Sequence, residues 1–178
     1  MKVEHQIRTF EKILAEYDGS QPLHRFLVTY FKANKQMGSS DRRWASRYLY
    51  SFFRLGKALP EQSTLERLVV ADFLCNTSSS LLLQSQRPDW NEQLRLPAAA
   101  KIVLVKDVYP AFELEAVFPF TSALSEGIDK QLFLESFFTQ PDLFIRVKAK
   151  HAAEIHAALT GAGVHVKELS KQVFSLPN

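Results

Sequence analysis

The sequence predicts a mainly α-helical protein: a helical bundle over residues 1–139, followed by a small, incomplete α/β unit over residues 140–178. In the first segment apolar residues recur every three or four positions, which is typical of helices with one buried face. Breaks rich in Pro, Gly and Ser separate these stretches at ordinary helix lengths. From residue 143 the apolar residues alternate instead, which indicates strands. The second segment is too short to bury a core of its own.

The first two predicted helices span residues 3–17 and 22–35. Apolar residues recur at helical spacing in both, and the polar residues 18–20 separate them. Pro22 suits the first turn of the second helix, because an N–H group has no intrahelical partner there. The residues expected to be buried on this helix are Leu23, Phe26, Leu27, Tyr30 and Phe31.

The helix predicted over residues 38–57 is the centre of the bundle. Ser40 is expected to cap its N-terminus, because a serine hydroxyl can accept a hydrogen bond from the free N–H groups there. On a helical wheel the large apolar residues fall on one arc, which predicts a side that faces the core. These residues are Trp44, Ala45, Tyr48, Leu49, Phe52 and Leu55.

Arginines occupy the opposite side of this helix. Arg43, Arg47 and Arg54 share one narrow stripe, and no acidic residue interrupts the sequence between Arg42 and Lys57. An arginine guanidinium can bind two phosphate oxygens at once, so these five cations are candidate RNA-binding residues. Charged stripes also occur where the charges are merely solvated, and the pattern alone leaves both interpretations open.

The later helices of the bundle are predicted from local signals. Ser63 and Glu66 have the S-x-x-E form of a capping box before a helix over residues 64–76. Further helices are expected at residues 81–87, 89–96 (one or two turns), 97–105 and 128–138, with an irregular segment containing one short helix over residues 108–125. The last helix is expected to be heavily buried through Leu132, Phe133, Leu134, Phe137 and Phe138.

The C-terminal segment is predicted to be β-α-β-β. Strands are expected at residues 143–148, 164–166 and 173–176, with a helix over residues 151–160 that a glycine turn ends. If this helix covers the face that Leu143, Ile145 and Val147 share, the opposite face of the sheet is open. That open face carries Phe144, Arg146 and Lys148. Small α/β RNA-binding modules stack bases and hold phosphates with such residues. An ordinary edge surface is the alternative.

Positive charge is concentrated in the first third of the chain. The net charge is only +3, but residues 1–60 carry 11 Lys or Arg and 5 Asp or Glu. Residues 61–139 carry 6 Lys or Arg and 11 Asp or Glu, so the net charge of this segment is negative. This asymmetry favours a polyanionic partner for the N-terminal helices.

A single cysteine, Cys75, excludes an intrachain disulfide and fits a reducing compartment. It follows an apolar run, so we expect a buried structural thiol and not a nucleophile. The charged N-terminus lacks a signal-peptide core, and no segment has the ~20 apolar residues that span a bilayer. We therefore expect a cytoplasmic protein with no membrane partner.

The sequence contains no catalytic, metal or cofactor motif. Its five histidines have no ligand spacing, and Cys75 has no second cysteine with which to form a zinc pair. No Gly-rich phosphate loop follows a strand, and no G-x-S-x-G nucleophile motif occurs. We expect no catalytic residues, metal ligands or bound cofactor in this segment, so the reaction centre of any enzyme would lie outside it.

Two segments resemble a known family. Residues 40–43, with Tyr50 and Arg54, resemble the RDR…YG…R helix in the N-terminal domain of the Sun/Fmu (RsmB-like) rRNA cytosine-C5 methyltransferases. That domain is related to the NusB fold. Residues 140–147 resemble the QPPLWLRVN strand that opens the next, RRM-like subdomain of the same family. Residues 51–52 replace a glycine-containing part of the first motif, and Lys148 stands where the family often has asparagine.

The resemblance implies a NusB-like RNA-binding domain over residues 1–139 and a partial RRM-like subdomain over residues 140–178. The family's Rossmann-type catalytic domain, with its S-adenosylmethionine loop and Pro-Cys nucleophile, is absent from this chain, and Cys75 matches no such motif. In the parent enzyme a cysteine thiolate would attack cytosine C6, and S-adenosylmethionine would methylate C5. The implied partners are ribosomal RNA and the chain's own catalytic domain, and the implied role is RNA recognition in rRNA processing.

Two other functions remain open on sequence grounds. The chain is also compatible with a self-contained NusB-type adaptor that binds RNA or protein without catalysis, or with a helical interaction module that has no nucleic-acid role. A Gly-rich loop and a Pro-Cys pair further along the gene would favour the enzyme over the adaptor. Binding of RNA in a gel shift would exclude the third function.

Overall fold

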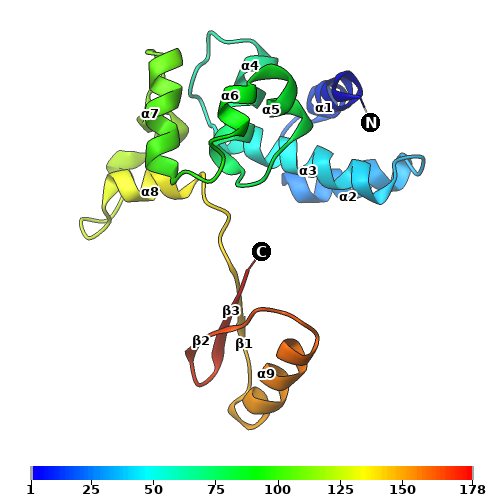
Figure 1. Cartoon of the computed structure of the whole chain (residues 1–178), viewed down its shortest axis with the longest axis vertical. Coiled ribbons are helices and arrows are strands. Elements are labelled where there is room, and N and C mark those ends of the chain that lie inside the picture. The colour runs from blue at the N-terminus through cyan, green and yellow to red at the C-terminus, as the bar shows by residue number, and fades with distance from the viewer. Residues whose placement is uncertain (1, 178) are drawn as a thin grey trace. The chain divides into compact units, whose positions relative to one another are not determined.

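A computed structural model describes residues 2–177, and the chain forms two compact units (Figure 1). The first unit ends at Thr139 and the second begins at Gln140, where the apolar period changes. The described part of the first unit is built from helices and loops, and the second combines a three-stranded antiparallel sheet with a helix. The predicted fold class, a helical bundle followed by a small α/β unit, is confirmed.

The helices of the first unit lie close to their predicted positions. They are α1 (Val3–Glu16), α2 (Leu23–Ala33), α3 (Ser39–Arg54), α4 (Thr64–Cys75), α5 (Leu81–Gln86), α6 (Pro88–Asn91), α7 (Ala98–Val108) and α8 (Lys130–Ser136). The segment predicted to hold one short helix contains two 3-10 turns, η1 (Leu114–Val117) and η2 (Thr121–Ala123). Helix α7 continues three residues past its predicted end at Val105.

Helix α3 lies at the centre of the first unit, packed on α4 and α1. All of its predicted core residues are buried. The Phe10 ring of α1 meets the rings of Tyr48 and Phe52 edge-on, at centroid distances of 6.5 Å and 5.3 Å. Edge-to-face aromatic packing of this kind adds to the burial of apolar area, so α3 is held by its aromatic side.

The helix caps are partly as predicted. Ser63 and Glu66 form the reciprocal capping box: the Ser63 hydroxyl accepts from the Glu66 N–H at 3.2 Å, and the Glu66 carboxylate accepts from the Ser63 N–H at 3.1 Å. The prediction that Ser40 caps α3 is wrong. Gly38 occupies the cap, and its N–H donates to the Asp41 carboxylate at 3.1 Å. The acidic side chain three residues on provides the acceptor, so Ser40 falls in the first turn.

The prediction for the last helix is wrong at Leu132, which is 64% exposed. Leu134 and Phe138 are buried, whereas Phe133 and Phe137 are half-buried against the core. Positions four apart share one face of a helix, and a residue two positions away points to the other side. The short α8, capped by the Asp129 carboxylate, therefore buries only one face.

Gly56 occupies a position that only glycine fits. Its φ is +58°, and an added Cβ would lie 2.2 Å from the carbonyl oxygen of Val117. We expect Gly56→Ala to lower the free energy of unfolding by about 2 kcal/mol, measured by urea denaturation. Gly127→Ala is the control, because nothing lies within 4 Å of its Cβ position. Equal losses in the two variants would contradict this prediction.

The second unit contains β1 (Leu143–Arg146), the 3-10 turn η3 (Ala149–His151), α9 (Ala152–Gly161), β2 (Lys167–Ser170) and β3 (Val173–Leu176). The strand order is β1-β3-β2, and β3 pairs antiparallel with both neighbours. Strands β1 and β2 are therefore parallel to each other and separated by β3. This is a split β-α-β arrangement.

The second strand was predicted at residues 164–166 and lies instead at residues 167–170. The backbone of Val164 is part of the end of α9: its N–H donates to the carbonyl of Leu159 at 3.0 Å, and the Gly163 N–H donates to Thr160 at 2.9 Å. Gly163 has the positive φ, +77°, that such a helix end requires. Strand pairing can therefore begin only after this turn.

Candidate nucleic-acid interface

The outer side of α3 carries two exposed aromatic rings with an exposed cation on either side of them. Arg43, Tyr50, Phe53 and Lys57 are exposed, and they lie at the helical spacing that brings side chains to one side of the helix or the turn that follows it. Tyr50 and Phe53 are each 42% exposed, although both are large rings. Asp41, in the first turn, is the single acidic residue of α3. This side can therefore bind anions and stack planar groups.

Arg42 lies at the N-terminal end of the same helix but is partly used by the fold. Its Nε donates to the carbonyl of Met37 at 2.9 Å, and its guanidinium lies 6.0 Å from the centre of the Phe31 ring. Arg42 and Arg43 line a shallow depression together with Met37, Ser39 and Ser46. The two arginines that the sequence places side by side thus meet at one surface, with Arg43 the more exposed.

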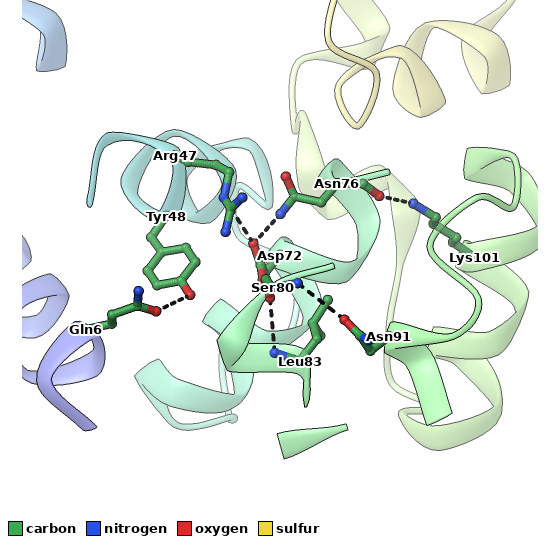
Figure 2. Close-up of polar contacts among 9 residues, drawn as sticks. All are labelled: Gln6, Arg47, Tyr48, Asp72, Asn76, Ser80, Leu83, Asn91 and Lys101. Atoms are coloured by element: carbon green, nitrogen blue, oxygen red, sulfur yellow. Dashed lines mark hydrogen bonds and ion pairs between the residues drawn. The ribbon is translucent and has the colours of Figure 1, made fainter. Parts of the chain in front are cut away.

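Arg47 belongs to a buried polar network and is not a freely solvated member of the stripe (Figure 2). Its Nε lies 3.9 Å from Oδ1 of Asp72 on α4, an ion-pair distance that is too long for a hydrogen bond. Its guanidinium lies 5.4 Å from the centre of the Tyr48 ring. The side chain is 36% exposed, so part of it still reaches solvent.

Asp72 is the fully buried centre of this network. It accepts hydrogen bonds from the Asn76 amide and, at 2.5 Å, from the Ser80 hydroxyl, and Figure 2 shows both groups pointing at it. Burial raises the pKa of Asp72, and the Arg47 charge opposes this rise. The buried Lys101 of α7 donates to the Asn76 carbonyl, and burial lowers the pKa of its ammonium group. The network thus joins four helices. Arg47 belongs to α3, Asp72 to α4 and Lys101 to α7, and Ser80 connects α5 because it caps that helix.

Sequence reasoning did not single out this network. Asp72 stands inside the apolar run of α4, and a carboxylate in such a run must be paired to be buried. The position of Asp72 in this run was therefore a sign in the sequence that a buried polar network exists. The partners could not be named from it, because Arg47 and Lys101 lie 25 and 29 positions away in the sequence.

Arg54 lies beside Cys75 at the C-terminal end of α4. Burial raises the pKa of the Cys75 thiol to about 11, opposed by the Arg54 charge and by hydrogen bonds from Ser51 and Arg54. Arg54 is half-buried and also lines a groove. The prediction of a structural thiol fits this environment, because a thiol with a raised pKa carries little thiolate at neutral pH.

The raised pKa of Cys75 predicts a pH dependence of stability. Between the ordinary thiol value, about 9, and about 11, the unfolded chain loses the thiol proton while the folded chain keeps it. The folded state then binds more protons, so stability falls as pH rises through this window, by about 2 kcal/mol in total. Urea denaturation from pH 8.5 to 11 should show this fall in the wild type relative to Cys75→Ala. Parallel curves for the two proteins would contradict it.

The second unit places Phe144 and Arg146 on one face of the sheet. Phe144 pairs with Ser175 and Arg146 with Val173, whereas Ile145 pairs with Phe174, whose ring lies 5.5 Å from that of His156 on α9. Phe144 is 59% exposed, and Arg146 and Lys148 are exposed. The face opposite α9 therefore carries the predicted aromatic residue and cations. Leu143, expected under the helix, is exposed as well.

Lys167 adds a cation that sequence reasoning missed. It pairs with Ser175 on β3, which places it on the same face as Phe144. It was overlooked because the second strand was predicted three residues too early. Tyr50 and Phe53 were missed as site residues for a different reason. They flank the arginine stripe but are uncharged, and the site on this helix was predicted from its charged residues alone.

Among residues 2–177, no three His, Cys, Asp or Glu side chains form a group that could hold a metal ion. In the same range, no helix combines the length and the apolar character needed to cross a bilayer. Comparison of the chain with protein-family models, with curated proteins and with solved structures found no match. The likeness to NusB and to the rRNA methyltransferases therefore stays a prediction.

Proposed function

We propose that this chain binds RNA and is the RNA-recognition N-terminal part of an S-adenosylmethionine-dependent rRNA cytosine-C5 methyltransferase. The observation that carries the proposal is the outer side of α3, where Arg43 and Lys57 flank the exposed rings of Tyr50 and Phe53. Cations bind phosphates, and exposed rings stack on bases. A surface that combines cations with exposed aromatic rings suits a nucleic acid better than a surface with only one of these side-chain types.

Single-stranded or looped RNA suits this surface better than a regular duplex. Aromatic side chains can stack only on bases that have left the helical stack, and sequence-specific RNA recognition is concentrated in loops, bulges and ends. Further exposed cations on α1, on α2 and in the loop that follows α2 enlarge the positive surface around α3. They are Arg8, Lys12, Arg25, Lys32 and Lys35.

The second unit supports the same proposal. Its split β-α-β sheet has an open face with Phe144, Arg146 and Lys167, and one aromatic residue among cations is the pattern of small sheet-based RNA binders. Lys148 follows directly after β1 and is exposed. We assign these residues to phosphate contact and stacking, as the resemblance to an RRM-like subdomain suggests.

The residues of this chain would position RNA and take no part in bond-making. S-adenosylmethionine and the nucleophilic thiolate would belong to the catalytic domain of the parent enzyme. Cys75 is unsuited to the nucleophile's role, because its pKa near 11 leaves it protonated at neutral pH. The proposed setting is the cytoplasm, where ribosomal RNA and a reduced cysteine occur together.

Binding of the wild-type chain to labelled RNA tests the proposal. Fluorescence anisotropy with a 20-nucleotide unstructured RNA should show saturable binding that weakens steadily with added salt, because counterions compete for the phosphates. The same strand paired into a duplex should bind more weakly. Absence of binding to both RNAs at low salt would remove the proposed function.

A further inference from the structure

We infer that the groove lined by Tyr17, Leu23, Tyr50, Phe53, Arg54 and Phe137 receives an unpaired base of single-stranded RNA. This inference rests on the proposed function and adds a specific site to it. The groove has a volume of about 390 Å³, which is in the range of small-molecule sites. Its walls come from the end of α1, the start of α2, the outer side of α3 and the end of α8.

The aromatic wall of the groove is held in place by the fold. Tyr17 donates from its hydroxyl to the carbonyl of Gln21 at 2.8 Å, which fixes the ring in the α1–α2 loop. The Tyr17 ring meets Phe53 edge-on at 5.4 Å and lies 5.1 Å from Phe26. Phe137, at the end of α8, is packed against Phe133 and Phe118. A base would thus enter a site whose rings are already ordered, which lowers the entropic cost of binding.

The lining of the groove matches a nucleotide in both shape and charge. Four of its six side chains are aromatic, Arg54 is its one charged member, and it contains no carboxylate. Every base presents a planar face that stacks on Tyr or Phe, and a guanidinium can stack on a base or donate to its acceptors. An acidic partner without rings would use only the charge of Arg54, and a purely apolar partner would use only the aromatic side chains.

The groove is continuous with the cationic side of α3. Tyr50, Phe53, Arg54 and Lys57 lie at positions i, i+3, i+4 and i+7, and Arg43 lies two turns before Tyr50. A strand whose phosphates contact Arg43 and Lys57 passes the groove between them, at the place where one base can turn inward. This arrangement commits the site to a nucleotide within a strand, with phosphates on both sides.

Fluorescent RNA provides a direct test. A 12-nucleotide unstructured RNA with one 2-aminopurine should show a fluorescence change on binding the full chain, because the probe responds to stacking. Tyr50→Leu and Phe53→Leu keep apolar volume and remove the stacking face, so each should weaken binding about tenfold and reduce the fluorescence change. Phe120→Leu is the matched control, since it makes the same change at an exposed ring that does not line the groove.

The outcomes separate this inference from the proposed function. If the Tyr50→Leu and Phe53→Leu variants bind RNA like the wild type while Arg43→Glu binds more weakly, the base site is excluded and the RNA-binding function stands. If the leucine variants only convert a wild-type dimer into a monomer, seen by sedimentation, the groove is a contact between copies and the inference fails. Circular dichroism of each variant checks that it is folded. Weaker binding and lost stacking in folded leucine variants support the base site.

Discussion

Replacing Asp72 by alanine is expected to lower the free energy of unfolding of the first unit by about 3–5 kcal/mol. The substitution leaves the Arg47 guanidinium without its buried counter-charge and removes the acceptor of the Asn76 and Ser80 side chains. Ser80 also caps α5, where its hydroxyl accepts from the Leu83 N–H at 3.1 Å. Loss of this one carboxylate therefore weakens the junction of several helices, because removing one partner of a buried network leaves the others unsatisfied.

Urea denaturation followed by tryptophan fluorescence measures this loss in the first unit. Both tryptophans, Trp44 and Trp90, are buried there, and Trp90 stacks at 4.6 Å on Phe73, the neighbour of Asp72 in sequence. Asp89→Ala is the matched control, since Asp89 pairs with Arg87 at an exposed site and should cost at most about 1 kcal/mol. Similar losses in the two variants would show that the Asp72 network contributes no more than a surface ion pair.

Reversing the charge of Arg43 and Lys57 together is expected to weaken RNA binding about 100-fold at low salt. Each substitution removes one charge-assisted contact to phosphate, and about 1.4 kcal/mol per site already corresponds to tenfold in affinity. Both side chains are exposed, so the double variant Arg43→Glu/Lys57→Glu should keep the stability of the wild type. Anisotropy with the 20-nucleotide RNA measures the affinity of each protein.

A charge-matched variant controls for the general effect of net charge. Arg95→Glu/Lys106→Glu makes the same change in net charge at exposed positions away from α3. It should weaken RNA binding only a few-fold, because screening limits the effect of charges that do not contact the strand. Equal losses in the two double variants would mean that RNA senses overall charge and not the outer side of α3.

Arg47 and Arg54 are unsuitable for charge reversal, although they belong to the stripe that the sequence predicts. A glutamate at position 47 would stand beside Asp72 in the buried network, and one at position 54 would stand beside Cys75. Either substitution would change stability together with any RNA contact. The structure thus moves the test of the stripe to Arg43 and to Lys57, which lies just past the helix end.

Local signals in the sequence predicted most of the first unit. The capping box of Ser63 and Glu66 and the apolar arc of α3 depend only on residues within a few turns of each other. Whether each arginine of α3 is solvated or paired depends on residues that are distant in the sequence. A helical wheel places Arg47 opposite the core, but only the packing of α4 on α3 brings Asp72 beside it. The same limit applies to Leu132, whose exposure follows from the single face that α8 buries.

The second unit shows why weak strands escape prediction. Strand β2 is polar and exposed, whereas residues 164–166 alternate apolar and polar as a half-buried strand does. The prediction therefore placed the strand at residues 164–166. The cap that Gly163 and Val164 build at the end of α9 decides where pairing starts. The alternation of β1 was strong enough to assign Phe144 and Arg146 to one face, whereas Lys167 became visible only through the register of β2 on β3.

The salt dependence of RNA binding tests the central claim most directly. For a single strand, each phosphate contact contributes about 0.7 to the slope of log K against log salt concentration. If Arg43 and Lys57 each contact a phosphate, the slope for Arg43→Glu/Lys57→Glu should be shallower than that of the wild type by about 1.4. The charge-matched Arg95→Glu/Lys106→Glu protein should keep the wild-type slope. An unchanged slope in the α3 variant would show that this side of the helix is solvated and does not bind RNA.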